Sequence, residues 1–527
     1  MMYVRTVWSL LLLPLVAEAL LHGKLSPWQK LNRLAAAKSA TYVCDGKPGP
    51  NDLSCTKNWI TQPVDHFNKA DTRNWSMQYE AMDQYFNNVT KNPIIFLMIG
   101  GEDAIAPYWI LDPKLQYLQW AKNFSAMVYQ TEHRFFGESH PLPDMTTANL
   151  KYLNTTQALE DLAFFIKSMN AKNKWVNPRW VTFGGSYPGS MAAWFRSKYP
   201  KLTVGSVASS APLNLKLDFY EYTLVMENTI RNESQKCAQL IDDAFGAMTK
   251  MALTTDGRNK LSKIFNAQPK FYDNNVTQIQ IYNFFGTIFN VYQDTIQYTY
   301  DGRYPGTYEQ NITVHSLCNT VLANNTGSTY GSDEDLATRI KNWYNQYNLY
   351  GNSKYLLSVD NSYQDGLPDQ QNVLFNGTDA AGRGWFWLCC NEIGFLQTTE
   401  LGKNIFHDIL TMNFQMQSCV DVFGPPVGPK FIRDHNIETQ KYYGGVDYFN
   451  ATNLFLPNGS LDPWHALGYY KDEAAKHVKT HLIQGTAHCG DMYAPYTDSK
   501  TQGELDKVHK MIYNELVFYL TGKEGTM

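Results

Sequence analysis

The sequence predicts an α/β fold in which a mostly parallel sheet, covered by helices on both faces, is interrupted by a block of helices. Between about residues 60 and 213, apolar runs of strand length alternate with helical segments, as in sheets whose two faces are both buried. From 214 to 445, helical periodicities dominate and apolar runs of strand length are scarce. After this block the strand pattern returns, and the chain closes on a helix. We therefore expect one α/β domain, formed by 20–213 and 446–527, with a helical cap inserted at 214–445.

Each element follows from the spacing of its apolar residues. Short apolar runs predict strands over 93–99, 126–129, 180–183, 204–208, 451–456 and 480–483. Apolar residues three or four positions apart predict helices over 159–169, 189–198, 237–251, 279–298, 333–347, 465–476 and 504–520.

The first residues, 1–19, have the pattern of a signal peptide. Arg5 gives a positive start, an apolar run follows at 7–16, and Ala17-Glu18-Ala19 supplies a small-x-small cleavage pattern. The run is too short to span a bilayer as a helix. We expect a mature chain that begins near Leu20 and has no membrane association once the signal is removed.

Cysteines and glycosylation sequons also indicate the secretory pathway. The chain has eight cysteines, an even number that favours disulfides in an oxidising compartment, and none shows the paired C-x-x-C spacing of a zinc site, so no metal is expected. The Asn-x-Ser/Thr pattern occurs at Asn74, Asn88, Asn123, Asn154, Asn232, Asn275, Asn311, Asn324, Asn376, Asn450 and Asn458. The sequence therefore predicts a glycoprotein that is secreted or lysosomal.

Ser186 lies where a predicted strand passes through a tight turn into a helix. This is the context of the nucleophile elbow, in which a strained turn exposes a serine at the start of a helix. The pattern G-x-S-x-G is met only in its first half, because Gly184 is in place but Pro188 occupies the second glycine position, with Gly189 one residue later. Proline is tolerated in the first helical turn. The alternative is an ordinary glycine-rich strand–helix turn.

An acid and a base follow in the order that α/β-hydrolases use, serine, then aspartate, then histidine. Asp462 comes after the strand predicted at 451–456, and His488 after the strand at 480–483. A histidine can take the serine proton, and an aspartate fixes the imidazole tautomer and stabilises its cationic form. Three residue types in this order after three strands predict a Ser186–Asp462–His488 triad on an α/β-hydrolase fold.

The same logic predicts an oxyanion hole. One backbone donor is expected from Tyr187, the residue after the nucleophile, and a second from Gly101, in the glycine-rich loop after the strand at 93–99. Glu102 in that loop is either a polar substrate contact or a carboxylate at a helix entry.

Several stretches together resemble one family. Gly-Gly-Ser-Tyr-x-Gly is followed by Ala-Ala-Trp-Phe-Arg-x-Lys-Tyr-Pro, with Glu-His-Arg-Phe-Phe-Gly-Glu-Ser upstream and Asn-Gly-x-x-Asp-Pro-Trp downstream. From about Trp59 to Phe518 the chain resembles the prolyl carboxypeptidase family of serine peptidases, which includes dipeptidyl peptidase II and the thymus-specific serine protease. The resemblance implies an α/β-hydrolase domain with a helical cap, acyl transfer without a cofactor, cleavage beside proline at acidic pH, and homodimers. It assigns nucleophile, acid and base to the same three residues as above.

The resemblance also bears on the cysteines. It pairs Cys390 with Cys419, and it offers Cys237 with Cys318 as a weaker pair; Cys44 with Cys55 is a local candidate. Two branches of the family have a second histidine after the catalytic one, whereas this chain has Cys489 there, which resembles the thymus-specific branch more. Cys489 is expected to pair with Cys389 or to be a free thiol.

The sequence thus predicts a serine peptidase, an exopeptidase acting near proline on peptide substrates. Two alternatives stay open. One is an esterase or lipase with the same triad, because the triad does not distinguish an amide from an ester. The other is a catalytically inactive binding glycoprotein on a hydrolase fold. The formal net charge of −4, without a dense Lys/Arg cluster, gives no basis for nucleic-acid binding.

Overall fold

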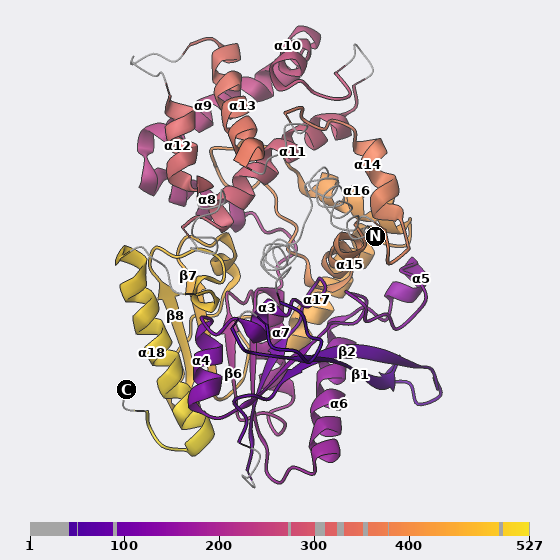
Figure 1. The fold of residues 1–527 in the computed structure, drawn as a ribbon. Helices are drawn as coiled ribbons and strands as arrows, with labels where there is room; N and C mark the ends of the chain where they lie inside the picture. Colours follow the sequence, from indigo (N-terminus) through magenta and orange to yellow (C-terminus); the bar gives the residue numbers. More distant parts are fainter. Residues whose placement is uncertain are drawn as a thin grey trace, which may run out of the picture.

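The computed structural model describes residues 42–49, 51–87, 92–271, 276–300, 311–323, 331–350, 357–377, 379–494 and 499–525. The predicted signal peptide lies outside these residues. A sheet of eight strands has the order β1-β2-β4-β3-β5-β6-β7-β8 (Figure 1). The strands are β1 (Thr56–Pro63), β2 (Asn74–Met82), β3 (Ile94–Ile99), β4 (Met127–Thr131), β5 (Arg179–Gly185), β6 (Gly205–Ser209), β7 (Leu454–Gly459) and β8 (Val478–Ile483).

The predicted α/β-hydrolase fold is confirmed, with one addition at the edge of the sheet. Strands β3 to β8 pair in parallel, but β1 pairs antiparallel with β2, and β2 antiparallel with β4. The sequence does not predict β1 and β2 because polar residues interrupt their apolar patterns. Backbone pairing and cross-strand contacts, rather than an apolar run, define them.

Alternate side chains of the central strands enter two separate cores. In β3, Ile95 and Leu97 belong to one core, and Phe96 and Met98 to the other. Successive side chains of a strand point to opposite faces, so a strand buried on both faces has a continuous apolar sequence. Helices α6 (Thr155–Asn173) and α7 (Tyr187–Lys198) pack into the first core, and α3 (Tyr108–Leu111), α4 (Gln116–Asn123) and α18 (Ser499–Thr521) into the second.

Between β6 and β7 the described part of the chain contributes helices and no strand to the sheet. Helices α8 to α16 stand together at one end of the sheet, at the top of Figure 1. Their apolar residues, such as Met226 and Phe289, join the same core as the α6 and α7 face of the sheet. The helical region is therefore packed onto the sheet through a shared core. The helices are α8 (Glu221–Glu233), α9 (Gln235–Ala252), α10 (Thr255–Phe265), α11 (Gln278–Gln297), α12 (Val314–Leu322), α13 (Asp333–Tyr350), α14 (Tyr363–Gln371), α15 (Ala380–Leu388), the π-helix η4 (Cys389–Ile393), α16 (Met412–Phe423) and α17 (Pro429–Tyr443), with α5 (Thr147–Leu150) preceding α6 in the first half of the chain.

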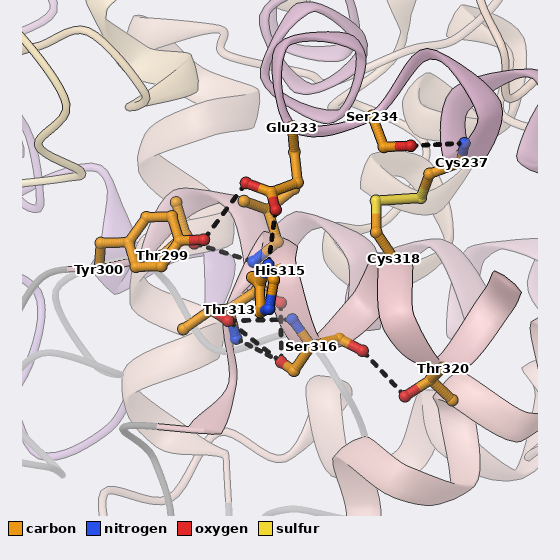
Figure 2. The surroundings of a disulfide bond; sticks show 11 residues. Glu233, Ser234, Cys237, Thr299, Tyr300, Thr313, His315, Ser316, Cys318 and Thr320 are labelled. Atoms are coloured by element: carbon orange, nitrogen blue, oxygen red, sulfur yellow. Dashed lines mark hydrogen bonds and ion pairs between the residues drawn. A yellow bond between two sulfur atoms is a disulfide. The ribbon is translucent and has the colours of Figure 1, made fainter. Parts of the chain in front are cut away.

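A disulfide ties two of these helices together. Cys237 in α9 is bonded to Cys318 in α12 (Figure 2). Beside it, Glu233 at the end of α8 accepts hydrogen bonds from His315 Nδ1 (2.7 Å) and from the Tyr300 hydroxyl (3.3 Å). The segment that follows α11 is thereby held against α8 and α12.

The prediction of one helix over 465–476 is wrong. The structure has two short 3₁₀ helices there, η5 (Pro463–Leu467) and η6 (Ala474–Lys476), joined by extended residues. Gly468 has an extended backbone after η5, and the Tyr470 hydroxyl donates to the His465 carbonyl at 2.7 Å. These local bonds compete with a continuing helix, which the residue spacing alone does not reveal.

The sequons differ in their exposure. Asn458 lies in β7 with 0% exposure, so the fold excludes a glycan there and this sequon is a chance match. Asn154 is half-buried as the N-cap of α6, where its side chain accepts from Gln157 N. Asn74, Asn123, Asn232, Asn311, Asn376 and Asn450 are exposed, whereas Asn88, Asn275 and Asn324 lie outside the described residues.

Candidate active site

Ser186 lies at the turn between β5 and α7 with a φ of 63° and a ψ of −132°. A positive φ is strained for a residue with a side chain, and the Ser186 amide is held there by donating to the Ser209 carbonyl at 2.9 Å. A Cβ on Gly184 would run into the Pro188 backbone, and a Cβ on Gly189 would lie 2.6 Å from the Ser209 oxygen. The close approach of helix to strand thus falls at Gly189, one residue later than in G-x-S-x-G.

Asp462 and His488 are joined by a hydrogen bond and are both fully buried. The Nδ1–H of His488 donates to Asp462 Oδ2 at 2.7 Å, and the backbone N–H of Trp464 donates to Asp462 Oδ1 at 2.9 Å. Asp462 follows β7 and His488 follows β8, which are neighbours in the sheet. The Nε2 atom of His488 is buried and has no hydrogen-bond partner among the described residues. This imidazole is therefore oriented by its carboxylate and has its other nitrogen available for a proton.

The residues of the predicted oxyanion hole lie at the ends of neighbouring strands. Strand β3 pairs in parallel with β5, so the loop of Gly101 leaves the sheet beside the turn of Ser186. Tyr187 is the first residue of α7, where backbone N–H groups have no partner within the helix. Gly100 must be glycine because a Cβ there would meet the Thr131 carbonyl.

The side chain of Tyr187 is anchored by His133. The Nδ1 of His133 lies 2.8 Å from the Arg134 carbonyl and must carry its proton, so Nε2 accepts from the Tyr187 hydroxyl at 3.1 Å. Burial lowers the pKa of His133 to about 4, which keeps the ring neutral. Burial, followed by the carboxylates of Glu392 and Glu102, holds the pKa of Tyr187 well above its usual range. The hydroxyl therefore stays a donor.

Glu102 is fully buried, with 0% exposure. Its carboxylate acts electrostatically on Tyr187 and on Cys389, whose pKa burial and this charge both raise. Glu102 thus lies close to Tyr187, the residue that follows Ser186.

Sequence reasoning missed a polar layer between β6 and the loop after β8. The Ser209 hydroxyl donates to Asp491 Oδ2 at 2.5 Å, and the Cys489 N–H donates to Ser210 Oγ at 2.9 Å. Burial raises the pKa of Asp491 to about 6, and the bond from Ser209 opposes that rise. An acid three residues after a candidate base was the available signal. These bonds fix the loop of His488 to the strand whose carbonyl holds Ser186.

A sequence profile described as Serine carboxypeptidase S28 matches residues 62–512. The chain belongs to the serine carboxypeptidase S28 family. A Caenorhabditis elegans protein provisionally named as a serine protease is 49% identical over 92% of this chain and 89% of its own length. The mouse thymus-specific serine protease is 28% identical, covering 83% of this chain and 82% of its own length. The bovine lysosomal Pro-X carboxypeptidase is 27% identical, covering 88% of each.

Membership of the S28 family makes the chain a serine-type peptidase and confirms the predicted family. The S28 fold of this chain forms three disulfides, Cys44–Cys55, Cys237–Cys318 and Cys390–Cys419. Of the two expectations for Cys489, the disulfide with Cys389 is not formed: both side chains are buried, and neither is in a disulfide. Cys489 instead packs at the elbow, where a Cβ on Gly185 would lie 2.9 Å from its Sγ.

The described residues bring potential metal ligands together at one place, Cys44, Cys55 and Glu80. Both cysteines there are committed to a disulfide, so the group offers one carboxylate and does not fit a metal ion. Among all the residues that the structure describes, no helix combines the length and the apolar character needed to span a bilayer.

Proposed function

We propose that this S28 peptidase cleaves peptide bonds through an acyl-enzyme on Ser186, with His488 as base and Asp462 as its orienting acid. The observation that carries the proposal is the buried hydrogen bond between His488 Nδ1 and Asp462, which follow β8 and β7 in the same sheet whose strand β5 ends just before Ser186. Ser186 Oγ attacks the scissile carbonyl carbon as its proton passes to His488 Nε2. The N–H groups of Tyr187 and Gly101 stabilise the oxyanion of the tetrahedral intermediate.

The second half of the reaction reverses these roles. His488 gives its proton to the leaving amine, and the C–N bond breaks to leave an ester on Ser186. Water then attacks that ester, losing a proton to His488, and the acid product leaves as Ser186 regains its hydrogen. The buried Asp462 carboxylate stabilises the imidazolium that forms in each step, and no cofactor takes part.

We further propose that the enzyme is an exopeptidase with a preference for proline. The name of the bovine lysosomal Pro-X carboxypeptidase, a relative matched over most of both chains, supports this. Helices α8 to α17, proposed as a cap at 214–445, contact the base loop itself, since the His488 N–H donates to the Gln297 carbonyl. A cap this close to the triad favours short chain ends over internal segments.

The secretory route, to the exterior or the lysosome, is proposed from three features. The first residues have a signal pattern, three disulfides form, and six sequons are exposed. Disulfides persist in oxidising compartments and not in the cytosol.

The nucleophile is tested with a fluorophosphonate probe on two variants, one at Ser186, the N-cap of α7, and one at Ser190 within α7. Ser186→Ala should abolish labelling and peptide hydrolysis, while Ser190→Ala, one turn along α7, should be labelled. Ser190 donates to the Pro212 carbonyl and has no place in the chemistry. Labelling that persists in folded Ser186→Ala would refute the assignment.

Specificity is tested with peptides that carry proline next to one end, with the other end blocked. Cleavage that requires a free carboxylate indicates a carboxypeptidase, and cleavage that requires a free amine indicates a dipeptidyl peptidase. Hydrolysis of simple esters without any peptide cleavage would instead support an esterase.

A further inference from the structure

Gln297, the last residue of α11, contacts both loops that carry the acid and the base. It is buried, with 4% exposure. Its backbone carbonyl accepts from the His488 N–H at 2.9 Å. Its side-chain Oε1 accepts from Trp464 Nε1 at 2.9 Å and from the Tyr222 hydroxyl at 2.6 Å. One residue of the helical region therefore bonds to the loop after β7, to the loop after β8 and to α8.

Trp464 connects this contact to the acid. Its backbone N–H donates to Asp462 Oδ1, while Asp462 Oδ2 accepts a hydrogen bond from the Nδ1–H of His488. The indole of Trp464 also contacts the His488 ring, with 6.3 Å between centroids. Fixing the indole through Gln297 therefore restricts both the carboxylate and the imidazole.

Tyr298, the residue after Gln297, contacts His488 directly. Its ring meets the His488 ring edge-on, with 6.0 Å between centroids. The segment beyond it is anchored in turn, because Thr299 Oγ1 accepts from Val314 N at 2.9 Å and Tyr300 donates to Glu233 (Figure 2). The end of α11 is thus held by α8 and by α12, the helix that the Cys237–Cys318 disulfide joins to α9.

We propose that Gln297 is a positioning residue for the Asp462–His488 pair, acting from the helical region; this rests on the triad of the proposed function. His488 Nε2 has no partner among the described residues, so the ring depends for its orientation on Asp462, on its backbone anchor and on the two aromatic rings. A misplacement of about 1 Å between base and nucleophile can cost roughly a hundredfold in rate. The Gln297 amide oxygen holds Trp464, whose backbone N–H positions Asp462 and whose indole contacts the His488 ring.

Gln297→Met tests the proposal, because it keeps the backbone carbonyl and much of the volume but removes the acceptor shared by Trp464 and Tyr222. We expect kcat to fall by about ten- to a hundredfold with KM within about twofold, since substrate contacts are unchanged. The rate of fluorophosphonate labelling should fall in parallel, and the limb of the pH–kcat/KM profile set by the base should shift. Gln297→Glu, which restores an acceptor for both donors, should recover part of kcat.

Gln293 provides the matched control. It lies one turn earlier on α11, and its side-chain amide donates to Gln397 within the helical region. Gln293→Met loses a similar bond without touching the triad loops, so its kcat and pH profile should match the wild type. Tyr222→Phe removes one donor and leaves Trp464 bonded, so it should lower kcat less than Gln297→Met. If Gln297→Met fails to fold, Tyr222→Phe is compared with Gln293→Met and should have the lower kcat.

Two outcomes would overturn the inference. One is a Gln297→Met enzyme that labels at the wild-type rate with an unchanged pH profile, even if its melting temperature falls. The other is an equal loss of kcat in Gln293→Met and Gln297→Met. Either would leave the proposed function intact as long as Ser186→Ala is inactive, whereas an active Ser186→Ala would remove the triad itself.

Discussion

Buried carboxyl groups predict that this peptidase is more stable in acid than at neutral pH. Glu80 in β2 is 2% exposed, and burial, with the charge of Glu132, raises its pKa to about 8 from an ordinary value of 4.5. Glu132, which follows β4 and is also buried, has its pKa raised to about 7 by burial. The folded protein therefore keeps protons that the unfolded chain releases.

The sign and size of the effect follow from linkage. A folded-state pKa above the unfolded value means that the stabilising contribution is complete below pH 4.5 and is lost as pH rises to about 8. Each pKa unit corresponds to about 1.4 kcal/mol, so Glu80 alone accounts for a loss of roughly 5 kcal/mol as an upper bound. Glu132 adds a loss between pH 4.5 and about 7.

Glu80→Gln removes the titration while keeping the shape of the side chain. The free energy of unfolding, measured with urea between pH 5 and pH 8.5, should fall less steeply with pH in this variant than in the wild type. The readout is the slope of the free energy of unfolding against pH. The new side-chain amide, if it lacks hydrogen-bond partners, lowers that free energy by an amount that does not depend on pH. Glu438→Gln, at an exposed position of α17, should keep the wild-type slope. Equal slopes in the wild type and Glu80→Gln would refute the reasoning.

Three further predictions concern the site. Asp462→Asn should lower kcat by about ten-thousandfold with little change in KM, because an amide at this position favours the wrong imidazole tautomer; steady-state kinetics on a proline peptide would show it, and a loss under tenfold would contradict the role. Gly189→Ala should lower the free energy of unfolding by about 1–3 kcal/mol and slow fluorophosphonate labelling, because its Cβ would press on the Ser209 carbonyl. Gly503→Ala, with nothing within 4 Å of the added Cβ, is its control. Ellman's reagent should find almost no thiol in the native protein and two per chain after denaturation, from Cys389 and Cys489; no thiol after denaturation would mean that these two are bonded.

The sequence predicted most of the sheet and the order of the chemical residues. Strands such as β3 and β5 are buried on both faces, so each is a continuous apolar run that can be recognised without the fold. Ser186, Asp462 and His488 each follow a predicted strand, and this local context marks them as the candidate triad. The second elbow glycine was displaced to Gly189, which only the distance between helix α7 and strand β6 explains.

Where bonded partners are distant in the chain, no local pattern of residues identifies them. The sequence offered Cys389 and Cys489 as a possible pair, but the fold joins the other six cysteines in three disulfides and leaves these two buried and outside any disulfide. Strands β1 and β2 form through pairing rather than apolar spacing, and the segment 465–476 is shaped by bonds such as that from Tyr470 to His465.

The sequence by itself therefore determined the α/β-hydrolase fold and the helical region between its strands, and it predicted the residues proposed to carry the chemistry, because each depends on the period of apolar residues or on neighbours in the chain. The tertiary structure alone decided what holds those residues in place. The contact of Gln297 with Trp464 and His488, and that of Ser209 with Asp491, join segments far apart in the chain. Such contacts depend on how the helices pack onto the sheet, and no spacing along the chain encodes that packing.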